Sequence, residues 1–283
     1  MSWQLLISLS VLLYSVNGLL HRVMMKDETS DPYTQTIAFT GLVGLFALII
    51  AIFRGGLQTN FSTNQFFLFL PMLIMGTFGN IFAFKGIKLI EASESTILVT
   101  SSKLWFIAGT LLILREPFSL KKVIGAVIVL VGVVMAQWRK SKFVFNIGAV
   151  YVLFSALFFA SSDILSFLIL RNFDATSLIV YFCILSTIAL IIIRPRTMQK
   201  LSFYKKPRRA ANILIVSAND TLASLFVFIA YQVGRNALQI GPLGATQTIV
   251  TVILALIFLG ETDNMFQKIA GAITVVVGTI LLL

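Results

Sequence analysis

The amino-acid sequence predicts an all-helical membrane protein whose ten transmembrane helices form two inverted repeats of five helices each. Three observations carry this prediction. The mean hydropathy is +0.96, and 58% of the 283 residues are hydrophobic. Ten apolar runs of membrane-spanning length follow one another along the chain. The second half of the sequence matches the first at a shift of 145 to 146 residues.

The charged residues are too few for a water-soluble protein. Asp, Glu, Lys and Arg make up 12% of the chain, against roughly 25% in soluble domains. The net charge of +11 lies in short basic clusters between apolar runs, which suits lipid headgroups, so we expect a lipid bilayer and no nucleic acid as partner. The single cysteine, Cys183, excludes an intrachain disulfide, and we expect it to pack as a small apolar side chain.

The ten runs are each bounded by charges or turn-forming residues, and a helix needs about 20 apolar residues to span a bilayer. Five of the six prolines fall between runs, and only Pro71 lies within one. The first run has no basic segment before it and no cleavage site after it, so we expect it to be a helix of the mature protein. The runs are residues 3–20, 33–53, 66–84, 92–114, 123–138, 145–170, 175–193, 213–233, 243–259 and 265–283.

The connections between runs carry unequal numbers of basic residues. Fifteen Lys and Arg fall in connections on one side and six on the other. The longest connection, 194–212, holds seven of them and is expected to be a plain solvated loop rather than a surface amphipathic stretch. Because cytoplasmic loops hold the excess of Lys and Arg, this count alone places 194–212 in the cytoplasm and both termini outside.

The internal match divides the chain into residues 1–142 and 143–283. Because each half has an odd number of helices, the second copy enters the membrane upside down, as in alternating-access transporters. A spacing of seven residues puts two glycines on one helix face and predicts a close helix contact. The matching residues are Glu116 with Glu261, and the pair Gly125 and Gly132 with the pair Gly271 and Gly278.

These residues resemble a known family. Residues 92–98, Glu116 and the glycine helix that follows are similar to the EamA-type repeat of the drug/metabolite transporter (DMT) superfamily, and 258–261 with the second glycine pair repeat the pattern. The resemblance implies a DMT-like fold, a cavity lined by helices one, three, four, six, eight and nine, and both termini in the cytoplasm, against the count of basic residues. Lys103 stands where many such repeats have proline, and Arg115 where glycine usually precedes the glutamate.

Three charged residues lie deep within the runs: Lys103, Asp163 and Asp220. All three fall within roughly 8 Å of the membrane midplane at 1.5 Å per residue, where each costs roughly 2.5 to 3.5 kcal/mol on insertion scales. Two interpretations remain open, an internal ion pair that fixes helix packing and an aqueous cavity that binds substrate. Charged and titratable residues near run ends are expected to reach the interface by snorkelling: His21, Lys85, Glu94 and Lys268.

Polar and aromatic side chains near the midplane extend this set. Tyr14 and Asn17 are three residues apart and share a helix face, whereas Asn219 and Asp220 are successive and point about 100° apart. Thr246, Gln247 and Thr248 are weaker candidates, since helix–helix hydrogen bonds explain them equally well. The candidate substrate-binding residues are Lys103, Asp163, Asp220, Tyr14, Asn17, Asn80, Asn219 and Trp105.

The sequence favours a secondary transporter over an enzyme. It contains no phosphate-binding loop for ATP and too few His and Cys for a zinc site, so we expect no catalytic residue, metal or cofactor. The small-molecule substrate is expected to be a polar metabolite such as an amino acid, its carboxylate near Lys103 and its amine near Asp163 or Asp220. Protons or a counter-substrate would then be the coupling partner, and the inner or plasma membrane the location.

Two alternatives stay open. The first is a proton-coupled exporter of organic cations, in which the carboxylates bind proton and drug in turn while Lys103 lowers the pKa of one of them. The second belongs to another class, a membrane-embedded lipid enzyme or a passive channel. An embedded enzyme would carry clustered acid/base groups or metal ligands near one interface, whereas the deep charges here lie at the midplane, and a channel would not need inverted repeats.

Overall fold

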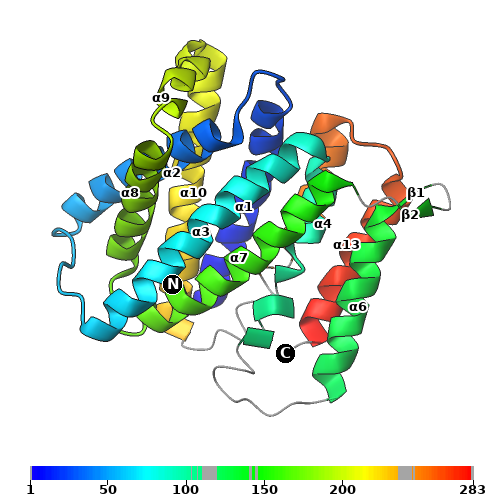
Figure 1. The fold of residues 1–283 in the computed structure, drawn as a ribbon. Coiled ribbons are helices and arrows are strands. Elements are labelled where there is room, and N and C mark those ends of the chain that lie inside the picture. Colours follow the sequence, from blue (N-terminus) through cyan, green and yellow to red (C-terminus); the bar gives the residue numbers. More distant parts are fainter. Residues whose placement is uncertain are drawn as a thin grey trace.

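The computed structural model describes residues 2–102, 104–106, 108–109, 120–139, 142–143, 146–234, 244 and 246–281. Its described regular elements are helices, apart from a two-residue antiparallel ladder in which β1 (Trp138–Arg139) pairs with β2 (Lys142–Phe143) (Figure 1). Lys103, Arg115 and Glu116 lie outside these residues.

Six described helices are long and apolar enough to cross a membrane. Each overlaps a predicted run, which confirms an integral membrane protein with several spans. They are α1 (Trp3–Met25), α2 (Pro32–Phe53), α3 (Thr63–Leu89), α7 (Ile147–Leu170), α8 (Ala175–Ile193) and α10 (Pro207–Gly234).

The other four runs correspond to shorter described helices. Parts of the fourth and ninth runs lie outside the described residues, so the structure does not establish the predicted count of ten. These helices are α4 (Ala92–Val99), α6 (Leu120–Gln137), α12 (Gln247–Leu254), which continues into the π-helical turn η2 (Ala255–Leu259), and α13 (Met265–Leu281).

The connection 194–212 is not the plain loop that the sequence predicted. It contains α9 (Thr197–Lys200) and the 3₁₀ turn η1 (Leu201–Lys205), and α10 already begins at Pro207. Proline suits the first helical position, where its missing N–H is not needed, and the next residues, Arg, Arg, Ala and Ala, are good helix formers. Hydropathy alone overlooks such a polar first turn.

Short polar side chains fix where the long helices begin. Ser2, Asp31, Asn146 and Asp174 each accept a hydrogen bond from the backbone N–H three residues on, at the starts of α1, α2, α7 and α8. Ser62 does the same for α3 and forms a capping box with Gln65. These bonds satisfy N–H groups that lack a partner within the helix.

The helices pack in pairs that each join the first part of the chain to the second. α1 packs on α10, α2 on α8, α3 on α7, α4 on α12 and α6 on α13. Figure 1 shows α3 beside α7 and α6 beside α13. Such pairs interlock the two parts of the chain. We call the end where α1 stops and α2 starts, which also carries the connection 194–212, the basic end.

The predicted glycine contact is confirmed between α6 and α13. A Cβ at Gly132 would lie 2.8 Å from the carbonyl oxygen of Gly271, and a Cβ at Gly278 would lie 2.8 Å from that of Gly125. The four glycines therefore meet crosswise in an antiparallel pair. Only a residue without a side chain lets the two backbones approach this closely.

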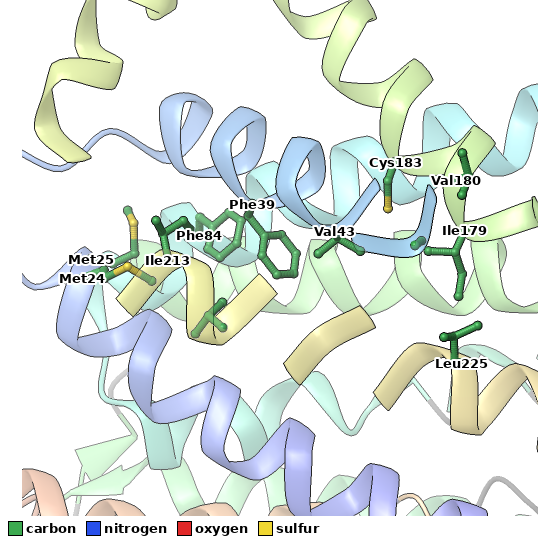
Figure 2. Close-up of a cluster of buried hydrophobic side chains, with 12 residues drawn as sticks. Met24, Met25, Phe39, Val43, Phe84, Ile179, Val180, Cys183, Ile213 and Leu225 are labelled. Carbon is green, nitrogen blue, oxygen red and sulfur yellow. The ribbon is translucent and has the colours of Figure 1, made fainter. Parts of the chain in front are cut away.

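A hydrophobic cluster fills the space where α1, α2, α3, α8 and α10 meet. Figure 2 shows Phe39 of α2 and Phe84 of α3 in this cluster, together with Cys183 of α8. Cys183 is 5% exposed, which confirms its predicted apolar packing. Large apolar side chains also point outward, such as Phe266 at 80% exposure. Such a surface suits lipid rather than water.

Candidate functional site

The middle of the helix pair α1–α10 carries a connected set of polar side chains, which we call the midplane cluster: Tyr14, Asn17, Asp220 and Ser224. Tyr14 is the central residue of α1, and Asp220 lies at the centre of α10. Asn17 Nδ2 donates to Asp220 Oδ1 at 3.2 Å, and Ser224 Oγ donates to Asp220 Oδ2 at 3.4 Å. The Tyr14 hydroxyl lies 2.8 Å from Ser224 Oγ. Both oxygens of the Asp220 carboxylate are therefore oriented by neighbours.

One acceptor of this cluster is left open. Asn17 is 3% exposed, and its side-chain oxygen is buried without a hydrogen-bond partner among the described residues. The amide cannot simply be turned round, because its oxygen would then face the Asp220 carboxylate. A buried acceptor without a donor costs free energy. The cluster is therefore suited to a ligand or water that donates hydrogen bonds.

A second carboxylate lies near this cluster. Asp163 of α7 is partly buried and lies within electrostatic range of Tyr14 and of Tyr231 on α10. Tyr14 is also within range of Asp220. Two carboxylates from different helices thus flank one tyrosine, in a region where negative charge is costly without a cation.

The structure places the other predicted site residues as follows. Asn80 of α3 and Asn219 of α10 are partly buried, and their side chains make no hydrogen bond within the described part of the chain. Trp105 is 47% exposed. Lys103 lies outside the described residues. The structure therefore joins Asn17 directly to Asp220, Tyr14 to Asp220 through Ser224, and Asp163 to Tyr14 electrostatically.

Two residues of this site were not predicted, Ser224 of the cluster and Tyr231 beside it. Their spacing was the available signal, because residues four and eleven positions after Asp220 return to the same helix face. Serine and tyrosine are common in membrane helices, however, and carry no charge that would single them out.

The glutamate of the second repeat caps a helix of the first. Glu261 accepts hydrogen bonds from the backbone N–H groups of Ala92 and Ser93, at 2.9 and 3.0 Å, and from the Ser93 hydroxyl at 2.7 Å. Arg22 Nε lies 4.0 Å from the same carboxylate. A negative charge at the start of α4 compensates its unpaired N–H groups and its dipole.

The predicted snorkelling of helix-end residues is wrong for Lys268, Glu94 and His21. Lys268 is 1% exposed and forms an ion pair with the partly buried Glu91 across the two halves of the chain. Glu94 is 1% exposed, and the imidazole of His21 is enclosed by two phenylalanine rings. These residues find partners or packing within the protein, which removes the need to reach water. We call Arg22, Glu91, Ser93, Glu261 and Lys268 the inter-half network.

Comparison with known proteins gives a family and a fold. The model of the EamA-like transporter family matches residues 1–138 and again residues 146–283. A solved structure described as "Crystal structure of protein" is similar with a TM-score of 0.69 at 14% identity, over 99% of this chain and 95% of that chain. At this identity the likeness concerns the fold alone. No curated protein matches the sequence.

Proposed function

The chain belongs to the EamA-like transporter family, and from this membership we propose that it is a secondary active transporter of small polar metabolites that carry an ammonium group. Amino acids and related zwitterions are the leading candidates. The midplane cluster carries the proposal. Its acceptors are the Asn17 oxygen, which has no hydrogen-bond partner among the described residues, and the Asp220 carboxylate, and the Asp163 carboxylate lies within electrostatic range of Tyr14. An ammonium group supplies three donors and a positive charge, the complement of this set.

The proposed mechanism is alternating access between two inverted five-helix halves, residues 1–142 and 143–283. The helix pairing supports it. In an inverted repeat of ten helices, α1 corresponds to α7 and α3 to α10. Replacing each helix by its counterpart in the other half turns the pair α1–α10 into the pair α7–α3. The same replacement leaves the pairs α2–α8, α4–α12 and α6–α13 unchanged. These five pairs are the ones observed. The substrate would then bind where the halves meet, near the midplane.

The inter-half network supports a closed state at the basic end. It ties Arg22, Glu91 and Ser93 of the first half to Glu261 and Lys268 of the second. Breaking these contacts would allow the halves to separate at that end. Since the sequence contains no ATP-binding loop, a gradient of protons or of a counter-substrate across the inner or plasma membrane would drive the cycle.

A second candidate substrate class is organic cations, exported in exchange for protons. The two carboxylates and the aromatic rings of Tyr14 and Tyr231 favour it, because cations bind both kinds of group. The two classes differ in their need for Lys103. A zwitterion requires it as partner of the substrate carboxylate, whereas a simple amine does not.

Counterflow in proteoliposomes tests the proposal. Vesicles are loaded in turn with unlabelled amino acids, with amines that lack a carboxylate and with carboxylates that lack an amine. The same compound in labelled form is then added outside, and its uptake is measured. We expect counterflow only for compounds with an ammonium group, reduced at least about tenfold in Asp220→Asn. The matched control is Asp263→Asn, an exposed carboxylate outside the cluster, which should leave uptake unchanged. Equal counterflow of carboxylates without an amine would refute the proposal.

A further inference from the structure

Two cations converge on one aromatic ring at the basic end. Arg194, just after α8, has Cζ 3.9 Å from the ring centroid of Tyr33 at the start of α2. Lys85 of α3 has Nζ 5.4 Å from the same centroid and 5.3 Å from those of Phe82 and Tyr151. Three helices, α2, α3 and α7, and the residue just after α8 therefore contribute to one aromatic cage with two positive charges. We call these five residues the cationic cage.

Several basic residues near the cage form ion pairs, which the two cage cations do not among the residues that the structure describes. Lys200 pairs with Asp31, Arg209 with Asp27, and Lys268 with Glu91. Within the described residues, neither cation of the cage has a carboxylate within ion-pair distance. Two like charges on one ring repel each other unless an anion lies between them. The cage is thus positively charged and lacks an anionic partner from the described chain.

An aromatic strip runs from the cage toward the middle of the membrane. Phe82 stacks on Phe158 at 5.6 Å, Phe158 stacks on Phe78 at 5.9 Å, and Phe154 lies 5.9 Å from Phe82. Phe78 and Phe154 are 47% and 48% exposed. Because seven residues separate Lys85 from Phe78, the strip extends about 10 Å along α3. It is an apolar surface directly below a pair of cations.

We propose that the cationic cage and the strip bind an anionic phospholipid of the leaflet at the basic end. The lipid phosphate would lie between Arg194 and Lys85, and an acyl chain would follow the strip. The guanidinium can hold a phosphate with two parallel hydrogen bonds, and basic pockets between transmembrane helices are known to suit anionic headgroups. A free phosphate would satisfy the cations but leave the strip unused. The site is separate from the midplane cluster, and its test does not involve transport.

Lipid retention by the detergent-purified full chain tests this site. Native mass spectrometry would count bound phosphatidylglycerol and phosphatidylcholine after addition of an equimolar mixture. We expect the wild type to retain at least about fivefold more phosphatidylglycerol. The variant Arg194→Gln with Lys85→Met should lose this preference, and Lys85→Arg with Arg194→Lys, which keeps the charges, should retain most of it. Since Arg194 is exposed, Arg194→Gln alone should fold normally and lose part of the preference.

The matched control removes the same charge at the same end. Lys206→Gln with Arg208→Gln changes two exposed residues outside the cage and should keep the wild-type preference. Equal retention of the two lipids by the wild type would overturn the proposal. So would an equal loss in the control, which would indicate general surface charge, or full displacement of the lipid by inorganic phosphate, which would indicate a small-anion site.

Discussion

Asp220 is held by a chain of side chains from two helices. Ser224 donates to one carboxylate oxygen and Asn17 to the other, while the Tyr14 hydroxyl bonds to Ser224. With Ser224 as the donor to Asp220, Tyr14 is the donor to Ser224. Three neutral groups thus fix the position of one carboxylate without neutralising its charge. Such a carboxylate is oriented for a partner that brings a positive charge, either a substrate or Lys103.

Single and double substitutions distinguish these two partners. If the deep charges bind substrate, Lys103→Met, Asp163→Asn and Asp220→Asn should each leave a folded, monodisperse protein and reduce transport at least about tenfold, equivalent to about 1.4 kcal/mol. An internal ion pair predicts that a single substitution strands a buried charge and lowers the free energy of unfolding by several kcal/mol. Thermal unfolding beside transport decides between them. Recovery of both stability and activity in a Lys103–Asp double variant would assign those two residues to packing.

Glu261 is expected to stabilise the protein by capping the first N–H groups of α4. Glu261→Gln keeps the shape but removes the charge near Arg22 and replaces one of the two acceptor oxygens with a donor that faces N–H or O–H groups. We expect a loss of about 1 to 3 kcal/mol in the free energy of unfolding. Denaturant unfolding in detergent measures it. Asp263→Asn, two residues away and exposed, should change nothing, and equal stability of both variants would contradict the capping role.

At the scale of helices, the sequence predicts where helices occur better than it predicts which helices contact one another. Hydropathy locates the six membrane-length helices because lipid selects apolar residues whatever their neighbours. It misses the polar first turn of α10, since Pro207, Arg208 and Arg209 carry no apolar signal. The i, i+3 spacing places Tyr14 and Asn17 on one face, and the structure joins both to α10. The burial of Lys268 could not be predicted, because its partner Glu91 lies in the other half of the chain.

The α6–α13 pair depends on close backbone contact. In Gly278→Ala the new Cβ would lie 2.6 Å from the backbone nitrogen of Val129, and a backbone atom cannot move aside as a side chain can. The helices would have to separate, and we expect a loss of about 1 to 3 kcal/mol in the free energy of unfolding. The matched control is Gly41→Ala in α2, whose Cβ would meet only the Thr187 side chain, its methyl group at 3.4 Å and its hydroxyl at 3.6 Å.

Thermal unfolding of both glycine variants in the same detergent checks this prediction. The control should be as stable as the wild type or slightly more stable, because alanine loses less backbone freedom than glycine in a helix. If Gly278→Ala unfolded at the control's temperature, the close crossing of α6 and α13 would not contribute to stability.

At the scale of the whole molecule, the ion pairs between described residues lie at the basic end. The Thr29 hydroxyl and backbone N–H, together with Arg209, hold the pKa of Asp27 below its usual value. Burial alone would raise the pKa of Asp31, but Lys200 and the N–H and hydroxyl of Thr34 hold it below its usual value. Both carboxylates therefore stay ionised near neutral pH and hold the connection 194–212 against the segment that joins α1 to α2.

Charge and family resemblance give opposite predictions for the side of the membrane that this end faces. Seven Lys and Arg in the connection 194–212 favour retention in the cytoplasm, whereas the family resemblance implies cytoplasmic termini and therefore places this connection outside. Single cysteines introduced at exposed positions of the two ends discriminate, Lys205→Cys in η1 and Asn64→Cys at the start of α3. The native Cys183 is 5% exposed and should give little background.

Labelling of intact cells with a membrane-impermeant maleimide is the measurement. If the basic end is cytoplasmic, Asn64→Cys reacts in intact cells, and Lys205→Cys reacts only after the membrane is permeabilised. The reverse pattern would show that the family arrangement holds and that the basic residues are outside. The excess of basic residues at this end would then be explained by anionic lipid and by the ion pairs with Asp27 and Asp31. Reaction of both cysteines in intact cells would mean that the chain inserts in both orientations. The reason is that position 205 lies at the basic end, whereas position 64 lies at the opposite end of the helices, where α3 begins.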